Sequence, residues 1–142
     1  MHFFEADIKY TLRGKRIISR CLKEYANKSG FEVGEVNYIF CSDEFLLGLN
    51  KRYLRHDYYT DILSFQNGKE PLEGDIYISI ERVKENANTL NTGFLTELYR
   101  VISHGLLHFM SYKDNTKEES DIMRVKEEEI IQLIKNYTDM KY

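Results

Sequence analysis

The sequence predicts an α+β fold, a mixed α/β layer in which a mixed sheet of about four strands is packed by about five helices. Strand-like segments lie mainly before residue 81, and three long helical patterns follow them. One of these helical patterns is apolar nearly all round, which indicates a central, buried helix. The chain has 142 residues, one proline and no linker-like tract, so residues 1–142 are expected to form a single domain.

Four segments show the alternation, or the β-branched and aromatic content, that is typical of strands. They are residues 2–8, 36–41, 60–65 and 74–80. The stretch NGKEPLEG, residues 67–74, lies between the last two segments and is rich in turn-forming residues. We therefore expect it to be the turn that joins them.

Apolar residues at helical spacing predict five helices, at residues 12–28, 42–52, 81–90, 94–110 and 117–137. Gly30 is a natural stop after the first helix, and Ser42 is a good N-cap for the second. The acidic side chains of Asp43 and Glu44 then suit the dipole of the second helix. The 94–110 helix carries the all-round apolar pattern, so we place it centrally, against the sheet.

The central helix also carries the strongest chemical signal in the chain, the segment HGLLHFMSYKDN that begins at His104. His104 and His108 are four residues apart, so both imidazoles project from one helix face and present two nitrogens to a single ion. Residues 110–112 break the helical pattern and let the chain turn back, so that Asp114 could approach the same ion. Two histidines and one carboxylate leave open positions for water, as catalytic metal sites do.

The spacing of the two histidines alone is equally compatible with hydrogen-bonded side chains in a core or groove. The apolar helix favours the metal site, because buried imidazoles are costly unless a partner satisfies them. The same spacing occurs in the HExxH metalloproteases, whose mechanism needs a glutamate after the first histidine as general base. Gly105 stands at that position here, so peptide hydrolysis by that mechanism is disfavoured.

Together with two upstream segments, the histidine segment resembles the YbeY family of bacterial rRNA-maturation endoribonucleases, whose motif is HGxLHLxGYDH. The motif is matched at His104, Gly105, Leu107, His108 and Tyr112. LNKRYLRHDYYTDILSF, residues 49–65, is similar to the family's LNxxYRxxDxPTDVLSFP, and EGDIYIS, residues 73–79, is similar to its LGDIxIS strand. The three segments match in order and spacing over residues 30–115.

The resemblance implies a metal-dependent hydrolase, a single-strand-specific endoribonuclease that acts in small-subunit rRNA 3′-end processing and ribosome quality control. It implies His104, His108 and Asp114 as catalytic residues and metal ligands, with one divalent ion that activates water for attack on a phosphodiester. The expected partners are single-stranded RNA, rRNA and the small ribosomal subunit, with no DNA. Two alternatives stay open: a metal-dependent hydrolase of another substrate, and a ribosome-associated binding module whose metal only stabilises the fold.

The sequence departs from the family motif at functionally important positions. Asp114 stands in place of the third histidine, and a carboxylate is a harder ligand than imidazole. Zn²⁺ is the expected ion, with iron, manganese and nickel as alternatives. The family's arginine in the upstream segment falls at Leu54, and we expect Arg55 to replace it in neutralising substrate phosphate. Three further arginines are alternatives for that role: Arg13, Arg16 and Arg52.

The general acid or base is not identified by the motifs. Three residues in or near the matching segments are candidates: Asp61, Glu97 and Tyr112. Each has a structural alternative as a helix cap, a support for a ligand or a packing residue. A further departure is Ser111, which stands where the family prefers glycine.

The net charge of −3 does not by itself suggest a nucleic-acid partner. The segment from Lys9 to Lys28 is nevertheless basic, with seven basic residues and one acid, Glu24: Lys9, Arg13, Lys15, Arg16, Arg20, Lys23 and Lys28. A local basic surface can attract a polyanion, although a solvated helix face explains the same pattern. The sequence shows no apolar run of membrane-spanning length and no signal-peptide pattern, so we expect a cytoplasmic protein without membrane contact.

Overall fold

The computed structural model describes residues 1–141, with side chains up to residue 138, and these residues form four strands and five helices. The strands are β1 (His2–Glu5), β2 (Val33–Cys41), β3 (Ile62–Lys69) and β4 (Leu72–Ser79). They lie in the order β1-β2-β4-β3, in which β1, β2 and β4 are parallel and β3 is antiparallel to β4. This mixed sheet confirms the predicted α+β class.

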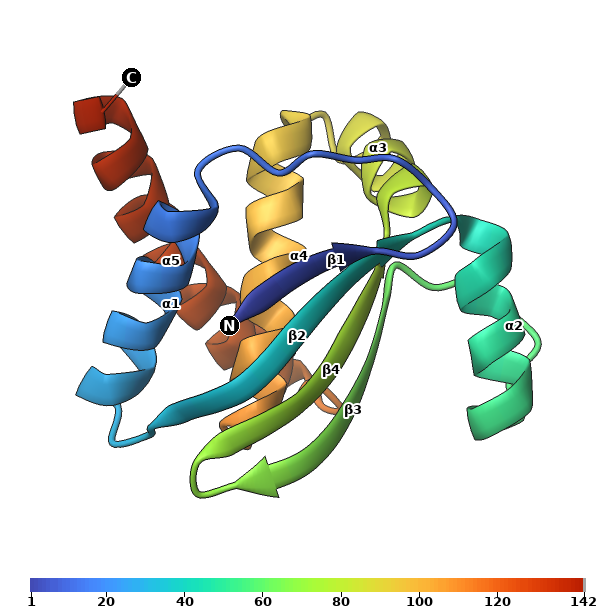
Figure 1. Cartoon of the computed structure of the whole chain (residues 1–142), viewed down its shortest axis with the longest axis horizontal. Helices are drawn as coiled ribbons and strands as arrows, with labels where there is room; N and C mark the ends of the chain where they lie inside the picture. Colours follow the sequence, from blue (N-terminus) through green and yellow to red (C-terminus); the bar gives the residue numbers. More distant parts are fainter. Residues whose placement is uncertain (142) are drawn as a thin grey trace.

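The helices are α1 (Lys15–Lys28), α2 (Asp43–Leu54), α3 (Ile80–Thr89), α4 (Phe94–Phe109) and α5 (Lys117–Lys141). Helices α1, α3, α4 and α5 pack on one face of the sheet, and α2 stands apart from them at the right of Figure 1. Side chains alternate between the two faces of a strand. Tyr38 and Ile76 therefore enter the main core under the four helices, while Tyr77 packs beside α2.

The helices appear in the predicted order, and the shift at the start of the first helix has a local cause. The first helix begins at Lys15 rather than at residue 12, because Gly14 precedes it in a left-handed conformation with φ 74°. Ser42 caps α2 as predicted, since its hydroxyl accepts a hydrogen bond of 3.1 Å from the N–H of Phe45. No helix in the described part of the chain is long and apolar enough to cross a membrane.

The predicted turn over residues 67–74 is wrong in its extent. The β3–β4 ladder continues to the pair Lys69 and Leu72, so the turn is confined to Glu70 and Pro71. The turn-forming residues before it lie at an irregularity in the register of β3 instead. In the structure these residues form a distorted part of the strand rather than a loop.

Helix α4 is the central helix, and two contacts fix its position on the sheet. The hydroxyl of Tyr38 on β2 donates a buried hydrogen bond of 2.8 Å to the carbonyl of Ile102. Gly105 allows close approach, because a Cβ there would lie 2.9 Å from Cγ2 of Ile76 and 3.1 Å from Cδ1 of Ile62. Gly105 therefore has a packing role, and it sets the histidine-bearing turn of α4 directly over β3 and β4.

Candidate metal centre

The end of α4 returns the chain toward the face that carries the two histidines. Ser111 follows the helix with a left-handed φ of 76°. Its N–H donates to the carbonyl of His108, and the N–H of Tyr112 donates to the carbonyl of Leu107, both at 3.0 Å. This pair of bonds is a Schellman C-cap, whose left-handed position favours glycine. The geometry explains the glycine of the family motif, which this chain replaces with serine.

The start of α5 fixes the loop that carries Asp114. The hydroxyl oxygen of Thr116 accepts a hydrogen bond from the N–H of Glu119, and the Glu119 carboxylate accepts one from the N–H of Thr116, both at 3.1 Å. This reciprocal pair is a capping box. The hydroxyl of Ser120 also donates to the carbonyl of Asp114 at 3.1 Å. The loop is therefore anchored to α5 beside the residue that turns back to α4.

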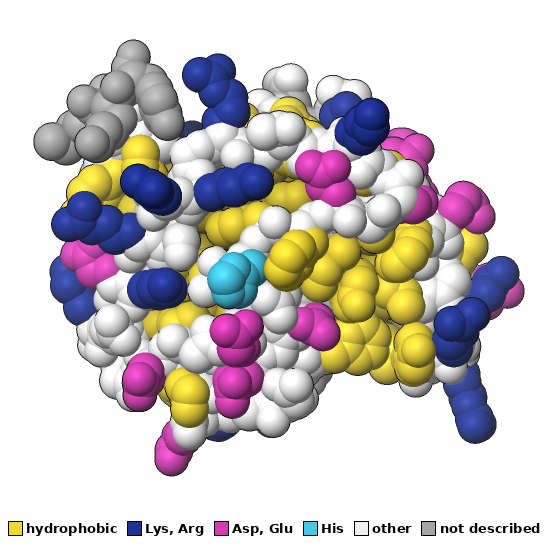
Figure 2. All heavy atoms as spheres, in the orientation of Figure 1, with side chains coloured by type: hydrophobic (Ala, Val, Ile, Leu, Met, Phe, Trp, Pro, Cys, Tyr) yellow, Lys and Arg dark blue, Asp and Glu magenta, His cyan; other side chains and the backbone are white. Residues whose placement is uncertain are grey.

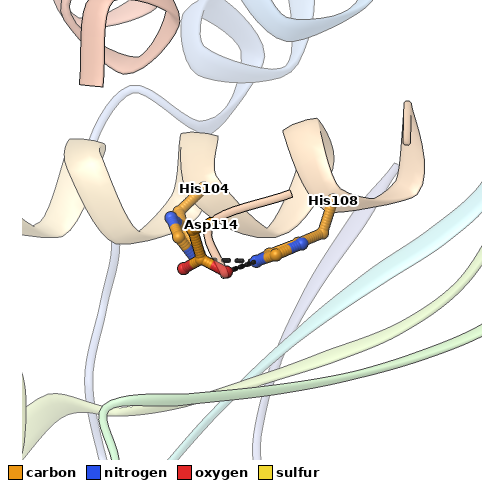
Figure 3. A group of neighbouring side chains, drawn as sticks. All are labelled: His104, His108 and Asp114. Atoms are coloured by element: carbon orange, nitrogen blue, oxygen red, sulfur yellow. Dashed lines mark hydrogen bonds and ion pairs between the residues drawn. The ribbon is translucent and has the colours of Figure 1, made fainter. Parts of the chain in front are cut away.

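His104, His108 and Asp114 converge on one point beside the last turns of α4 (Figure 3). The Nε2 atoms of the two histidines are 2.9 Å apart. Oδ2 of Asp114 lies 3.3 Å from Nε2 of His104, and its Oδ1 lies 3.5 Å from Nε2 of His108. Ligand atoms bound at ~2.0 Å to a tetrahedral ion lie ~3.3 Å from one another. The three side chains therefore fit a single metal ion.

Glu127 on α5 contacts His104 at Nδ1, the ring nitrogen that faces away from the other two candidate ligands. Its Oε2 lies 2.6 Å from Nδ1 of His104, and its side chain is buried. A proton on Nδ1 that is donated to this carboxylate leaves Nε2 free to face the other two residues, as metal-binding histidines require. Burial opposes the charged form of His104, but the hydrogen bond to Glu127, together with the negative charges of Glu127, Asp114 and Asp61, outweighs it and raises the pKa of His104. Burial, followed by the charge of His104, lowers the pKa of His108.

Arg100 links Glu127 to two other carboxylates. Its guanidinium nitrogens lie 3.5 Å from Glu97, 3.5 Å from Glu127 and 3.4 Å from Glu128. Glu97 and Glu127 are buried, and burial raises the pKa of Glu97 although Arg100 opposes that rise. Removing one partner from such a buried group leaves an uncompensated charge, which is strongly destabilising. Arg100 therefore stabilises the buried carboxylates beside His104, Glu127 among them, by its ion pairs with them.

A cavity of about 280 Å³, lined by His104, Asp114, Arg124 and Glu127 among others, borders the candidate metal centre on the α5 side, and two further cavities border it as well. Of these two, one of about 260 Å³ is lined by His104 and Asp114 together with Arg100 and Arg124. The other, of about 360 Å³, is lined by all three candidate ligands, Leu54 and residues 60–64. These two cavities both include Asp61 in their lining. A substrate can therefore approach the ligands from the β3 side and from the α5 side.

The structure does not bring Arg55 to this centre. Arg55 is an exposed residue that ends α2 with a left-handed φ of 56°, and Leu54 lines the adjoining cavity in its place. Neither Arg13 nor Arg52 lines the cavities described above. Arg16 lines a separate groove on α1. The expectation that Arg55 neutralises substrate phosphate has no support in its position.

The three candidate acids or bases are placed differently. Asp61 lines two of these cavities, accepts a hydrogen bond of 3.3 Å from Asn86, and has its pKa raised by burial. Glu97 lines one cavity but is engaged by Arg100. Tyr112 packs against the main core and lines none of these cavities. Asp61 is the candidate that the structure leaves beside the ligands.

Sequence reasoning missed Glu127, Arg100 and Arg124 as parts of the centre. A signal for Arg100 was present in the spacing on α4, since it lies four residues before His104 and so shares its helix face. On α5, Arg124 and Glu127 are three residues apart and also share a face. Which face of α5 meets α4 depends on tertiary packing, so the second pair could not be assigned from the sequence.

The contact with Glu127 leads to a first prediction. We expect Glu127→Gln to weaken metal affinity by roughly 10–100-fold, the usual cost of losing such a support, while the glutamine keeps the shape of the buried side chain. Competition with a chelating dye measures the affinity. Glu128→Gln is the matched control, because it removes a neighbouring charge that also contacts Arg100 but is half exposed. Equal affinities for the two variants would show that Glu127 does not support the site.

The comparisons with known proteins identify the family to which this chain is similar. Residues 4–135 match the family model described as Endoribonuclease YbeY. The chain is 48% identical over 135 residues to an Endoribonuclease YbeY of Cytophaga hutchinsonii, with 94% of each chain covered. It is 56% identical over 102 residues to one of Christiangramia forsetii, with 71% of each covered.

The fold has a counterpart among solved structures. A solution structure from Thermotoga maritima superposes with a TM-score of 0.70 at 26% identity, covering 99% of this chain and 93% of that one. The family match spans nearly all the described residues and includes α4, its histidines and the loop that follows. The chain therefore belongs to the YbeY endoribonuclease family.

Proposed function

We propose that this chain is a single-strand-specific, metal-dependent endoribonuclease with His104, His108 and Asp114 as its metal ligands. Membership in the family supports cleavage of RNA by hydrolysis. The observation that carries the assignment of the site is the convergence of three donor atoms, with separations of 2.9, 3.3 and 3.5 Å, beside two open cavities. We place its action in the cytoplasm, on small-subunit rRNA 3′ ends and in ribosome quality control, with residues 1–142 as one domain.

The donor set suits one divalent transition metal. Zn²⁺ is our first choice because two imidazoles and a carboxylate form a common catalytic zinc set, and iron, manganese and nickel suit the harder carboxylate. When bound, such an ion would supply an activated water and would polarise a phosphoryl oxygen. Within the protein, Glu127 would orient His104, and the capped α4–α5 loop would hold Asp114 at the distance that the structure shows.

We assign contact with substrate phosphate to Arg124. Leu54, at the position of the family's arginine, carries no charge, and Arg100 is already engaged by three carboxylates. Arg124 is exposed and lines two cavities that also include His104 and Asp114. A guanidinium can bind two phosphate oxygens at once and so fix the substrate as well as neutralise it. We assign a proton-transfer role to Asp61, which lines two cavities beside the ligands and whose pKa is raised by burial.

Removal and return of the metal test this proposal. We expect chelated protein to leave single-stranded RNA intact, and Zn²⁺ added back at about one equivalent to restore cleavage. The same RNA in a duplex should resist cleavage, and iron, manganese and nickel, each added alone, identify the preferred ion. Hydrolysis of simple phosphodiesters with intact RNA would favour the other-substrate hydrolase. A lower melting temperature after chelation, with no turnover under any condition, would favour a structural metal.

Arg124 gives a separate prediction. A charge-assisted hydrogen bond contributes about 1.5–3 kcal/mol, so Arg124→Gln should lower kcat/KM for RNA by roughly 10–100-fold. Arg124→Lys keeps the charge without the two-pronged geometry and should recover part of the loss. Steady-state cleavage of a labelled RNA measures both variants. Lys126→Gln on the same helix is the control, and an Arg124→Gln activity equal to that of this control would remove Arg124 from the site.

A further inference from the structure

A larger hollow lies away from the metal centre. It is an open groove of about 850 Å³ between α1 and the start of β1, with Tyr137 of α5 at its border. It shares no lining residue with the cavities at the metal centre. Five of its lining residues are basic and one, Glu24, is acidic; the basic ones are Lys15, Arg16, Arg20, Lys23 and Lys28. Basic side chains are prominent over α1, at the left of Figure 2.

The basic side chains form an ordered row with few neutralising partners. Arg16, Arg20 and Lys23 are four and three residues apart, so they follow one helix face over about 10 Å. All three are exposed. Within residues 1–138, whose side chains the structure describes, the one ion pair formed by these five basic groove residues is that of Lys28 with Glu24, at 3.3 Å. The charges of the row are therefore available to a ligand.

The groove is also lined by rings, from the start of β1 and from α5. Phe3 and Tyr137 are partly exposed there, and His2 is exposed beside them. Surfaces that bind single-stranded nucleic acid combine a positive track for the phosphates with rings on which bases stack. A merely solvated helix face would need neither rings beside it nor a row of basic side chains without ion pairs. Both features fit a single-stranded polyanion that carries bases.

We propose that this groove binds the backbone of the RNA substrate at a distance from the cleavage site. The inference rests on the proposed function, because it takes RNA as the substrate. The row from Arg16 to Lys23 matches about three stacked nucleotides at ~3.4 Å each. The groove thus adds affinity for a long RNA strand without touching the reacting phosphate, and it explains a local basic surface on a chain with net charge −3.

Binding measured without metal tests the groove by itself. The probe is a labelled oligouridylate of about 20 nucleotides, longer than a single binding surface covers, in buffer with EDTA. Arg16→Gln/Arg20→Gln/Lys23→Gln should raise the Kd by at least about 10-fold at low salt. The slope of log Kd against log salt concentration should fall by about 2, because each lost phosphate contact contributes ~0.7 to that slope. Lys51→Gln/Lys84→Gln/Lys126→Gln is the matched control, since it makes the same charge change outside the groove. Thermal melts verify that both variants are folded.

Cleavage separates the groove from the metal centre. With metal added, the groove variant should raise KM for the long RNA and leave kcat unchanged, and it should cleave an RNA of about four nucleotides as the wild type does. A wild type that binds the long RNA but cuts nothing would overturn the proposed function while the binding comparison still supported the groove. Equal Kd values for the groove variant and its control, or no RNA binding by the wild type, would overturn the groove. The groove would also be overturned if the groove variant lost affinity for polyglutamate while its affinity for RNA was unchanged.

Discussion

Replacing His108 by alanine is expected to lower RNA cleavage by about 1,000-fold or more, because the metal contributes several kcal/mol to the reaction and each 1.36 kcal/mol is tenfold in rate. His108 supplies one of three converging donor atoms. Without it, only Nε2 of His104 and Oδ2 of Asp114, 3.3 Å apart, remain to bind the ion. The measurement is single-turnover cleavage of a labelled single-stranded RNA, with the metal content of the same sample determined in parallel.

His56→Ala is the matched control for that loss. His56 is exposed on the α2–β3 connection, pairs with the hydroxyl of Tyr58, and lines none of the cavities described at the centre. We expect it to retain wild-type activity. Undiminished cleavage by metal-free His108→Ala would contradict the proposed mechanism, because the reaction would then need neither the His108 side chain nor the metal ion.

The second large effect is expected at Asp114. Asp114→Ala should weaken metal affinity by more than the roughly 100-fold that losing a supporting residue can cost, since a direct ligand is removed. Asp114→His restores the side chain that the family motif has at this position, so it should retain the metal and shift preference toward zinc over manganese. Competition titrations with a chelating dye, run for each metal separately, measure both changes.

Glu118→Ala controls for the loss of a carboxylate near the same loop. Glu118 is an exposed residue in the first turn of α5, and it is not among the three converging residues. Its metal affinity should equal that of the wild type. If Asp114→Ala also bound metal with unchanged affinity, Asp114 would be a neighbour of the two histidines rather than a ligand.

The fold was predictable where local patterns decide it. The apolar pattern of residues 94–110 identified the central helix, and Ser42 marked the start of α2 because its cap depends on neighbouring residues alone. The extent of the β3–β4 turn was not predictable, because glycine and asparagine are common both in turns and at irregularities within a strand. Long-range pairing resolved that ambiguity.

The candidate site was predictable to a similar degree. His104 and His108 share a helix face whatever surrounds them, and Asp114 is brought back by a C-cap that the break after α4 suggested. Glu127 lies 23 residues from its partner His104, so its contact depends on how α5 packs on α4. Arg55 is a neighbour of Leu54 in sequence, but of the two only Leu54 lines a cavity at the site, and this depends on tertiary packing rather than on a local pattern.

The most direct test of the three-residue centre is elemental analysis of protein purified without added metal. The arrangement of His104, His108 and Asp114 predicts about one divalent transition-metal ion per chain in the wild type and much less than one in Asp114→Ala. Glu118→Ala should match the wild type. Equal metal content in the wild type and Asp114→Ala, or no metal in a wild type that cleaves RNA, would contradict the account.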